Sequence, residues 1–345
     1  MVATGEQVPV VALTGHLGAG KTTLLNRLLL EPGVRLGVVV NDFGAVNIDA
    51  ALVEGQVGTV QSFAGGCLCH VQDESEFDDA LEALSHPRLA LDAIVVEASG
   101  LAEPLALARM IRYSGAEHVR PGGLVEVVDA VHYFETLDTG GAPPVRFAAA
   151  TLVVLNKVDL LDDARREAEL ARIEARVREV NPSAYVVRTS RGHLDPALVL
   201  DVAQPEAPEG ELPLAALLRD ERLAEHSYEH DHVHASSVSV SSDQPVDADA
   251  LVDLLESPPE GAYRLKGRVE VDLGRGRRIY VVHVVGRHRH VARASRGRAG
   301  CELVAIGLHL DDDGARARME AVLRSGGRST LRGVERLERL VRLSE

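Results

Sequence analysis

Two hydrophobic patterns alternate along residues 1–202. Short, unbroken apolar runs are typical of strands buried on both faces of a parallel sheet, whereas apolar residues spaced three or four positions apart predict helices. Polar segments follow directly after several of the predicted strands. This order predicts a doubly wound, mostly parallel α/β sheet whose site lies along the carboxyl ends of its strands. The predicted strands are residues 10–13, 36–40, 91–96, 124–128, 151–155 and 185–188, and the predicted helices include 24–29, 77–84 and 164–180.

The pattern changes after residue 202, where a stretch rich in proline, glutamate and glycine begins. Serine and valine then alternate along residues 237–241, which is typical of a strand with one buried face. Further strands are predicted at residues 268–271, 279–285 and 303–308, and helices at 247–255 and 315–323. We therefore predict a smaller α+β C-terminal domain. The expected divisions are a first domain at 1–202, a linker with a His-rich segment at 203–235, the second domain at 236–326 and a C-terminal tail at 327–345.

Residues 15–22 read GHLGAGKT and match the P-loop pattern G-x-x-x-x-G-K-[ST] at every fixed position. A predicted strand precedes them and a predicted helix follows, as a P-loop NTPase requires. The glycines let several backbone N–H groups point at one phosphate near the positive end of the helix. Lys21 is expected to reach the β- and γ-phosphates, and the Thr22 hydroxyl to ligate Mg²⁺. The predicted phosphate-binding residues are Gly15, Gly18, Ala19, Gly20, Lys21, Thr22 and Thr23.

Residues 156–159 read NKVD and follow a predicted strand, which is the N-K-x-D arrangement of GTP-binding proteins. A carboxylate at Asp159 can accept hydrogen bonds from both N1–H and N2–H₂ of guanine, whereas adenine offers neither donor there. A wrong base would leave this buried acceptor unpaired, so the preference should be strong. We therefore predict that Asn156, Lys157 and Asp159 bind the base of GTP, and we disfavour a small-molecule kinase that uses ATP.

Glu97 closes the strand predicted at residues 91–96, which is the position of a Walker-B acid acting on Mg²⁺ directly or through its waters. Gly100 lies where a backbone N–H could sense the γ-phosphate and move a switch. Lys21, Thr22, Glu97 and Gly100 form the predicted catalytic group. No residue stands out as a water-positioning glutamine or an arginine finger, so we expect slow intrinsic hydrolysis.

Two thiols and an imidazole occur within four residues, at Cys67, Cys69 and His70. They can converge on one borderline ion such as Zn²⁺. Free cysteines are also used as small buried hydrophobes. The position between the segments around Asp42 and Gly100, which are both expected to change with the bound nucleotide, favours a metal site. A second group of histidines admits two interpretations, a loose metal site or a solvated polar linker. Its members are His226, His230, His232 and His234.

Composition narrows the expected partners and the compartment. A net charge of −15 argues against binding nucleic acid through broad phosphate contacts. The three cysteines cannot form a fully paired disulfide framework, which favours a reducing cytoplasm. The first residues lack a signal-peptide pattern, and the longest apolar runs are too short for a membrane span. We therefore expect a cytoplasmic protein with no nucleic-acid or membrane partner.

Five motifs in this order resemble those of the CobW-type metallochaperone GTPases, relatives of the UreG and HypB metal-insertion proteins. They are the P-loop, NDFG at residues 41–44, GGCLCH at 65–70, EASGLAEP at 97–104 and NKVD at 156–159. YRLKG at residues 263–267 resembles the Arg-x-Lys-Gly segment of the CobW C-terminal domain. Two departures matter. His70 stands where the family's C-x-C-C motif has its third cysteine, and Ala45 replaces the second acid of N-E-F-G-E. Asp42, the shortened first acid, is still expected to serve Mg²⁺ or the delivered ion.

The resemblance implies a GTP-hydrolysing metallochaperone that delivers a divalent transition metal to a client metalloprotein. Zinc is favoured, with Cys67, Cys69 and His70 as ligands. Magnesium would be held by Thr22, Asp42 and Glu97. Three alternatives stay open: a cobalt chaperone for cobalamin synthesis, an activator of a metalloenzyme of the nitrile hydratase type, and a nucleotide-switched protein-binding module with structural cysteines. Both a monomer and a homodimer fit the sequence.

Overall fold

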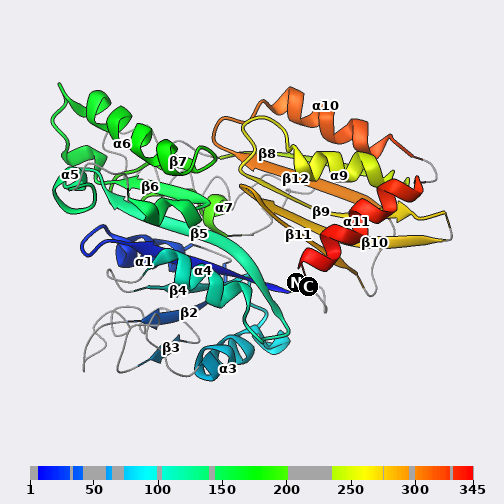
Figure 1. The fold of residues 1–345 in the computed structure, drawn as a ribbon, viewed down its shortest axis with the longest axis horizontal. Coiled ribbons are helices and arrows are strands. Elements are labelled where there is room, and N and C mark those ends of the chain that lie inside the picture. Colours follow the sequence, from blue (N-terminus) through cyan, green and yellow to red (C-terminus); the bar gives the residue numbers. More distant parts are fainter. Residues whose placement is uncertain are drawn as a thin grey trace, which may run out of the picture.

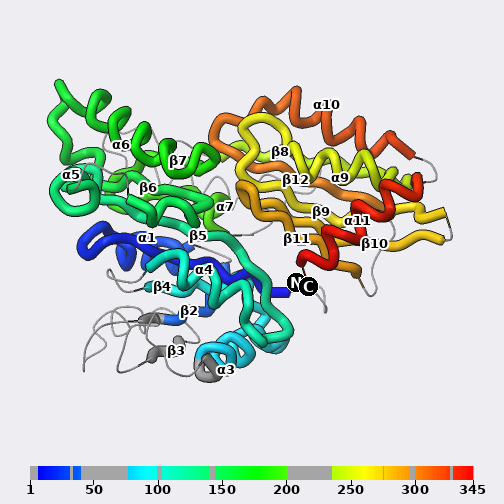
Figure 2. Tube along the Cα trace, in the orientation of Figure 1, coloured from blue at the N-terminus to red at the C-terminus, as the bar shows by residue number. Residues whose placement is uncertain are grey.

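The computed structural model of the chain holds two β-sheets, and helices cover each of them (Figure 1). The chain completes the first sheet before it enters the second, as the blue-to-green and the yellow-to-red parts of the tube in Figure 2 show. The structure describes residues 7–31, 34–41, 60–63, 74–98, 103–139, 144–200, 235–274, 276–294, 300–326 and 329–344.

The first sheet has seven described strands, all parallel, in the order β3-β2-β4-β1-β5-β6-β7. Strand β1 (Val8–Gly15) is central, with β4 (Ala93–Glu97) on one side and β5 (Val119–Asp129) on the other. The strand order reverses around β1, and ligands of open α/β sheets bind at such a reversal, outside the carboxyl ends of the strands. The other strands are β2 (Leu36–Asn41), β3 (Val60–Phe63), β6 (Leu152–Asn156) and β7 (Tyr185–Arg188).

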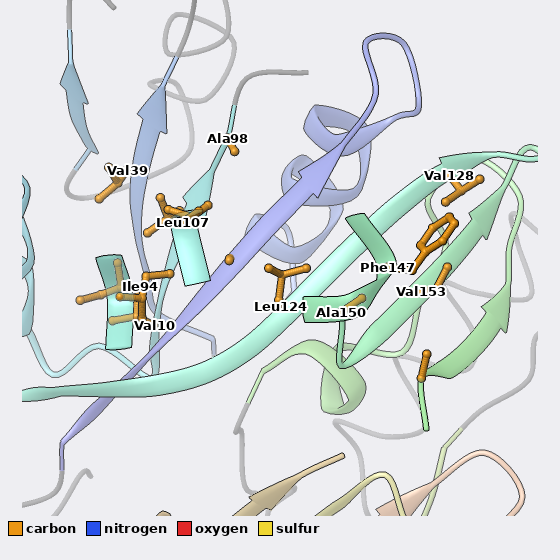
Figure 3. Close-up of a cluster of buried hydrophobic side chains, with 14 of the residues drawn as sticks. Val10, Val39, Ile94, Ala98, Leu107, Leu124, Val128, Phe147, Ala150 and Val153 are labelled. Atoms are coloured by element: carbon orange, nitrogen blue, oxygen red, sulfur yellow. The ribbon is translucent and has the colours of Figure 1, made fainter. Parts of the chain in front are cut away.

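Helices pack on both faces of this sheet, which is therefore doubly wound as predicted. Helices α1 (Lys21–Leu29) and α7 (Pro196–Val199) cover one face. The opposite face is covered by α3 (Glu74–Ser85), α4 (Pro104–Arg112) and α6 (Arg166–Val180). Figure 3 shows apolar side chains of this second core. Short helical turns complete this part of the chain: η2 (Pro87–Leu89), α5 (Tyr133–Thr136), η3 (Val145–Ala149) and η4 (Val158–Leu160).

The second sheet is antiparallel, in the order β11-β10-β9-β12-β8. Three helices lie on one of its faces and close a separate core (Figure 1). This is the predicted smaller α+β C-terminal domain. Its strands are β8 (Ser236–Ser242), β9 (Arg264–Asp272), β10 (Arg277–Val285), β11 (His288–Arg293) and β12 (Cys301–Gly307), and its helices are α9 (Ala248–Glu256), α10 (Asp312–Leu323) and α11 (Leu331–Ser344). Helix α11 buries Leu337 and Val341 in this core.

A buried polar junction joins the C-terminal domain to the amino ends of the parallel strands. Arg264 is only 3% exposed and donates hydrogen bonds to the carbonyls of Leu198 (3.0 Å) and Val199 (2.7 Å). The hydroxyls of Tyr263 and Thr151 lie 3.0 Å apart, which connects the junction to the start of β6. Such a buried cation is stable only because its donors are paired with carbonyl oxygens. The first two residues of the YRLKG segment therefore have a structural use.

The described helices include none that is both long and apolar enough to span a membrane.

Candidate functional site

The phosphate loop leaves the carboxyl end of β1 and feeds directly into α1. Lys21, the first residue of α1, is largely buried and bends back over the loop. Its Nζ donates to the carbonyl of Gly15 at 3.0 Å and to that of His16 at 3.4 Å. The ammonium group is thus held over the concave side of the loop, where phosphate oxygens can replace these carbonyls as acceptors. Thr23 follows on α1 with an exposed side chain.

Two glycines of the loop have no room for a side chain. A Cβ on Gly15 would lie 2.4 Å from the carbonyl oxygen of Val127. Gly20 caps α1 with a φ of +104°, and a Cβ there would lie 2.3 Å from Nδ2 of Asn156. Only glycine allows both the left-handed backbone and this close approach. The glycine spacing read from the sequence therefore has a direct steric cause.

Thr22 and Glu97 meet at the edge of the sheet. The Thr22 hydroxyl donates a hydrogen bond of 2.8 Å to Oε1 of Glu97, which is 2% exposed at the end of β4. The pairing is possible because β4 lies beside β1 in parallel register, with Glu97 opposite Leu13. Hydroxyl and carboxylate oxygens are the hard donors that Mg²⁺ prefers, so this pair fits that ion. The structure thus brings together two of the three predicted magnesium ligands.

Asn156 connects the phosphate loop to the loop that follows β7. Its side-chain amide donates to the Ala19 carbonyl at 2.9 Å, and its oxygen accepts from the N–H of Gly192, also at 2.9 Å. Both groups of the amide are used, and the residue is 2% exposed. Replacing this side chain would leave a buried carbonyl and a buried N–H without a partner. Asn156 therefore fixes the distance between the phosphate loop and the following segment.

Lys157 is held by an ion pair that the sequence did not indicate. Its backbone has a φ of +64°, and its Nζ lies 2.7 Å from Oδ2 of Asp129, at the end of the neighbouring strand β5. Asp129 also accepts from the N–H of Val131 and contacts the His132 ring. Burial raises the pKa of Asp129, but the Lys157, His132 and Val131 donors outweigh this and hold it below its usual value. Asp129 is therefore an ionised anchor for Lys157.

Asp159 presents a carboxylate whose acceptor capacity is unused. Its Oδ1 is buried and accepts no hydrogen bond from the residues that the structure describes. The guanidinium of Arg191, which is 82% exposed, places its Nε 4.0 Å from Oδ2. A contact of this length to a solvated side chain contributes little. A buried unpaired acceptor is costly, which is the condition expected of a group that a ligand completes.

Several predicted site residues lie outside the described residues. They are Asp42, Cys67, Cys69, His70 and Gly100, together with His226, His230, His232 and His234. Within the described ranges, no group of three or more His, Cys, Asp or Glu side chains is placed to hold a metal ion. The third cysteine, Cys301, is buried in the C-terminal core and donates to the Gln244 carbonyl, so it packs as a small hydrophobe.

Two family models match the chain. The model of the CobW/HypB/UreG nucleotide-binding domain matches residues 9–188, and that of the cobalamin synthesis protein cobW C-terminal domain matches residues 235–323. Among curated proteins, the zinc chaperone YjiA of Escherichia coli is 28% identical over 201 residues, which cover 56% of this chain and 61% of YjiA. The zinc chaperone CobW of a Sinorhizobium species is 26% identical over 359 residues, covering 93% of this chain and 99% of that protein.

Solved structures of related proteins are more distant. The Zn(II)-bound YjiA GTPase from E. coli is 21% identical, with a TM-score of 0.43 and coverage of 92% of this chain and 99% of YjiA. HypB from Helicobacter pylori in complex with nickel is 17% identical, with a TM-score of 0.40 and coverage of 66% and 92%. The model of the CobW/HypB/UreG nucleotide-binding domain matches more than half of the residues of this chain, and the protein therefore belongs to the CobW/HypB/UreG family.

Proposed function

We propose that the protein is a GTPase that couples nucleotide binding to the carriage of a divalent transition metal. The observation that supports GTP most directly is the buried, unpaired Oδ1 of Asp159. It lies three residues after Asn156, whose side chain contacts the phosphate loop. One nucleotide could therefore place its phosphates on the loop and donate from its base to Asp159. Guanine has two adjacent N–H donors from which this carboxylate can accept hydrogen bonds, and adenine does not.

The residues of the loop supply the means for hydrolysis. Lys21 would exchange the carbonyls of Gly15 and His16 for β- and γ-phosphate oxygens. Thr22, Glu97 and Asp42 are the proposed holders of Mg²⁺, which when bound would neutralise charge on the phosphates. Water would attack the γ-phosphorus as the bond to the GDP oxygen breaks. No water-positioning glutamine or arginine finger was identified in the sequence, so we expect slow intrinsic turnover.

The metal would be bound at Cys67, Cys69 and His70, with zinc as the expected ion. YjiA of E. coli and CobW of Sinorhizobium both carry the name zinc chaperone, which supports this choice. Two thiolates and one imidazole suit Zn²⁺ and leave one coordination position for a ligand from a client metalloprotein. The segment that contains them follows β3 and precedes Glu97 in the chain. Thiolate ligands also require a reducing compartment, which favours the cytoplasm.

Metal content and metal-dependent turnover test the carrier role. Protein purified without an affinity tag should contain close to one zinc per chain by elemental analysis. The double variant Cys67→Ser/Cys69→Ser should lose that zinc and any stimulation of GTP hydrolysis by added Zn²⁺. Cys301→Ser is the matched control, because Cys301 is buried in the other domain. Unchanged zinc content in the double variant would refute the assignment of the ligands.

A further inference from the structure

A charged side chain lies where the surrounding pattern requires an apolar one. Glu126 is on β5 between Val125 and Val127, and it is 0% exposed. Leu124 and Val128, its neighbours on the same face of the strand, belong to the same apolar core as Phe147 of η3, and Figure 3 shows the three side chains. Burying a lone carboxylate in such a core is costly unless other groups compensate for it. The carboxylate lies opposite Thr14 of β1, the residue directly before the phosphate loop.

Two side chains compensate for the burial of Glu126. The hydroxyl of Thr14, its neighbour in register on β1, donates to Oε2 at 2.5 Å. The guanidinium of Arg146, on η3, forms an ion pair with Oε1. Arg146 is itself only 15% exposed, so the pair is almost fully desolvated. Thr14, Glu126 and Arg146 are hereafter called the buried triad.

The buried triad adjoins the phosphate loop on two sides. Thr14 is the residue directly before Gly15, whose carbonyl accepts from Lys21. Burial raises the pKa of Glu126, and the positive charges of Arg146 and Lys21 both oppose that rise. The positive charge of Lys21 thus favours the ionised form of Glu126. On the other side, η3 packs against α4, the first described helix after Glu97.

A purely structural explanation accounts poorly for this arrangement. Replacing a buried ion pair by apolar residues of similar volume is often neutral or stabilising, so stability alone gives no reason for Glu126 and Arg146. What the pair supplies that apolar residues cannot is a charged acceptor for Thr14 at 2.5 Å, shorter than its 3.3 Å contact to the Val125 carbonyl, and a negative charge that interacts with Lys21. Both act at the point where β1 becomes the phosphate loop.

We propose that Glu126, held by Arg146, is a positioning residue for the phosphate loop: it fixes Thr14 and thereby the backbone of Gly15 that orients Lys21. This inference rests on the proposed nucleotide site. It assigns Glu126 no contact with the nucleotide. Its action is on the phosphate end of the site, so the base preference should not depend on it.

Nucleotide binding by four variants tests the proposal. Thr14→Val replaces the hydroxyl by a methyl group, and Thr14→Ser keeps the hydroxyl. Glu126→Met/Arg146→Met replaces the ion pair by apolar side chains of similar length. The control, Asp138→Leu/Arg176→Met, removes another largely buried acid–arginine pair, whose side chains are 3% and 21% exposed and whose arginine is on α6. For each, the dissociation constants of GTP, GDP and ITP, the kcat and KM of hydrolysis, and the thermal midpoint would be measured.

We expect Thr14→Val and Glu126→Met/Arg146→Met to weaken GTP and GDP binding about tenfold and to lower kcat/KM at least as much, with an unchanged ITP-to-GTP ratio. Thr14→Ser should stay within about threefold of the wild type, and the control should change only the thermal midpoint. A GTP affinity within about twofold of the wild type for either Thr14→Val or Glu126→Met/Arg146→Met would overturn the proposal while leaving the GTPase assignment intact. A wild-type protein that fails to bind GTP would remove both.

Discussion

Asp159→Asn should reverse the base preference of the site. The carboxylate can accept from both N1–H and N2–H₂ of guanine, and its Oδ1 is buried and unpaired among the described residues. An amide keeps one acceptor and turns a donor toward the other guanine donor. The loss is one charge-assisted hydrogen bond, worth about 1.5–3 kcal/mol, plus a buried unpaired donor that costs about 1–3 kcal/mol. We expect a total of about 2.5–6 kcal/mol, which weakens GTP binding by a factor of roughly 10²–10⁴.

Titration with fluorescent nucleotide analogues measures this change. The variant should bind xanthosine triphosphate more tightly than GTP, because the C2 carbonyl of xanthine accepts from the new amide. Asp163→Asn is the control, since that side chain is 89% exposed and only forms an ion pair with Arg166. A dissociation constant for GTP within about threefold of the wild type, or no gain for xanthosine triphosphate, would refute the assignment of Asp159 to the base.

Three further predictions concern Gly20 and Asp129. Gly20→Ala should abolish detectable GTP binding, because the new Cβ would lie 2.3 Å from Nδ2 of Asn156 and the φ of +104° is strained for alanine. Equilibrium dialysis with GTP tests this prediction, and a measurable affinity would contradict it. Asp129→Asn should weaken GTP binding about tenfold by releasing Lys157, with calorimetry as the measurement and an unchanged affinity as the contrary result. The lowered pKa of Asp129 means that its ionised form stabilises the fold above about pH 3.8 and that this contribution is lost as the pH falls through the lowered pKa. Denaturant unfolding of the wild type and Asp129→Asn should therefore differ at neutral pH and converge in strong acid, whereas a constant difference would contradict this.

The fold class followed from the sequence because its signals are local. Unbroken apolar runs predicted β1, β2, β4, β5, β6 and β7 to within a few residues at most ends, and β5 proved longer than residues 124–128. Helix α4 was not predicted, although Pro104 at its start and the spacing of Leu107 and Ile111 are helix signals. Strand β11 was also missed, because its charged and histidine residues hide the alternation. Gly286, at the hairpin before it with a φ of +56°, was the available signal.

For the candidate site, too, local motifs could be predicted from the sequence, whereas contacts that depend on strand order could not. Motif spacing was enough to place Lys21 over the phosphate loop and Thr22 beside Glu97, since strand ends at one sheet edge converge. The ion pair between Asp129 and Lys157 could not be read from the sequence, because it depends on β5 lying next to β6 and on the positive φ of Lys157. Pairs that far apart in the chain become neighbours only through the strand order.

The buried triad also depends on contacts between residues that are distant in the chain, but one of its members could be recognised from the sequence. Glu126 interrupts an otherwise apolar strand, which is a recognisable anomaly. Its partners are 112 residues before it and on η3 after it, so no local pattern could name them. A charged residue inside a predicted buried strand is thus worth treating as a candidate for function before the structure is known.

Linkage gives the proposed carrier cycle a strict condition. If bound GTP tightens the binding of zinc, zinc must tighten the binding of GTP by the same factor. A coupling of about tenfold corresponds to about 1.4 kcal/mol shared between the two sites. A ligand that does not distinguish the two nucleotide states could not be loaded in one and released in the other.

Isothermal calorimetry of Zn²⁺ binding in the two nucleotide states tests the central claim most directly. The protein would be titrated once with a non-hydrolysable GTP analogue and Mg²⁺ bound, and once with GDP and Mg²⁺ bound. We predict at least tenfold tighter binding of Zn²⁺ in the first state, and loss of this difference in Cys67→Ser/Cys69→Ser. Equal Zn²⁺ affinities in the two states would contradict the carrier role and leave a GTPase without a metal cycle.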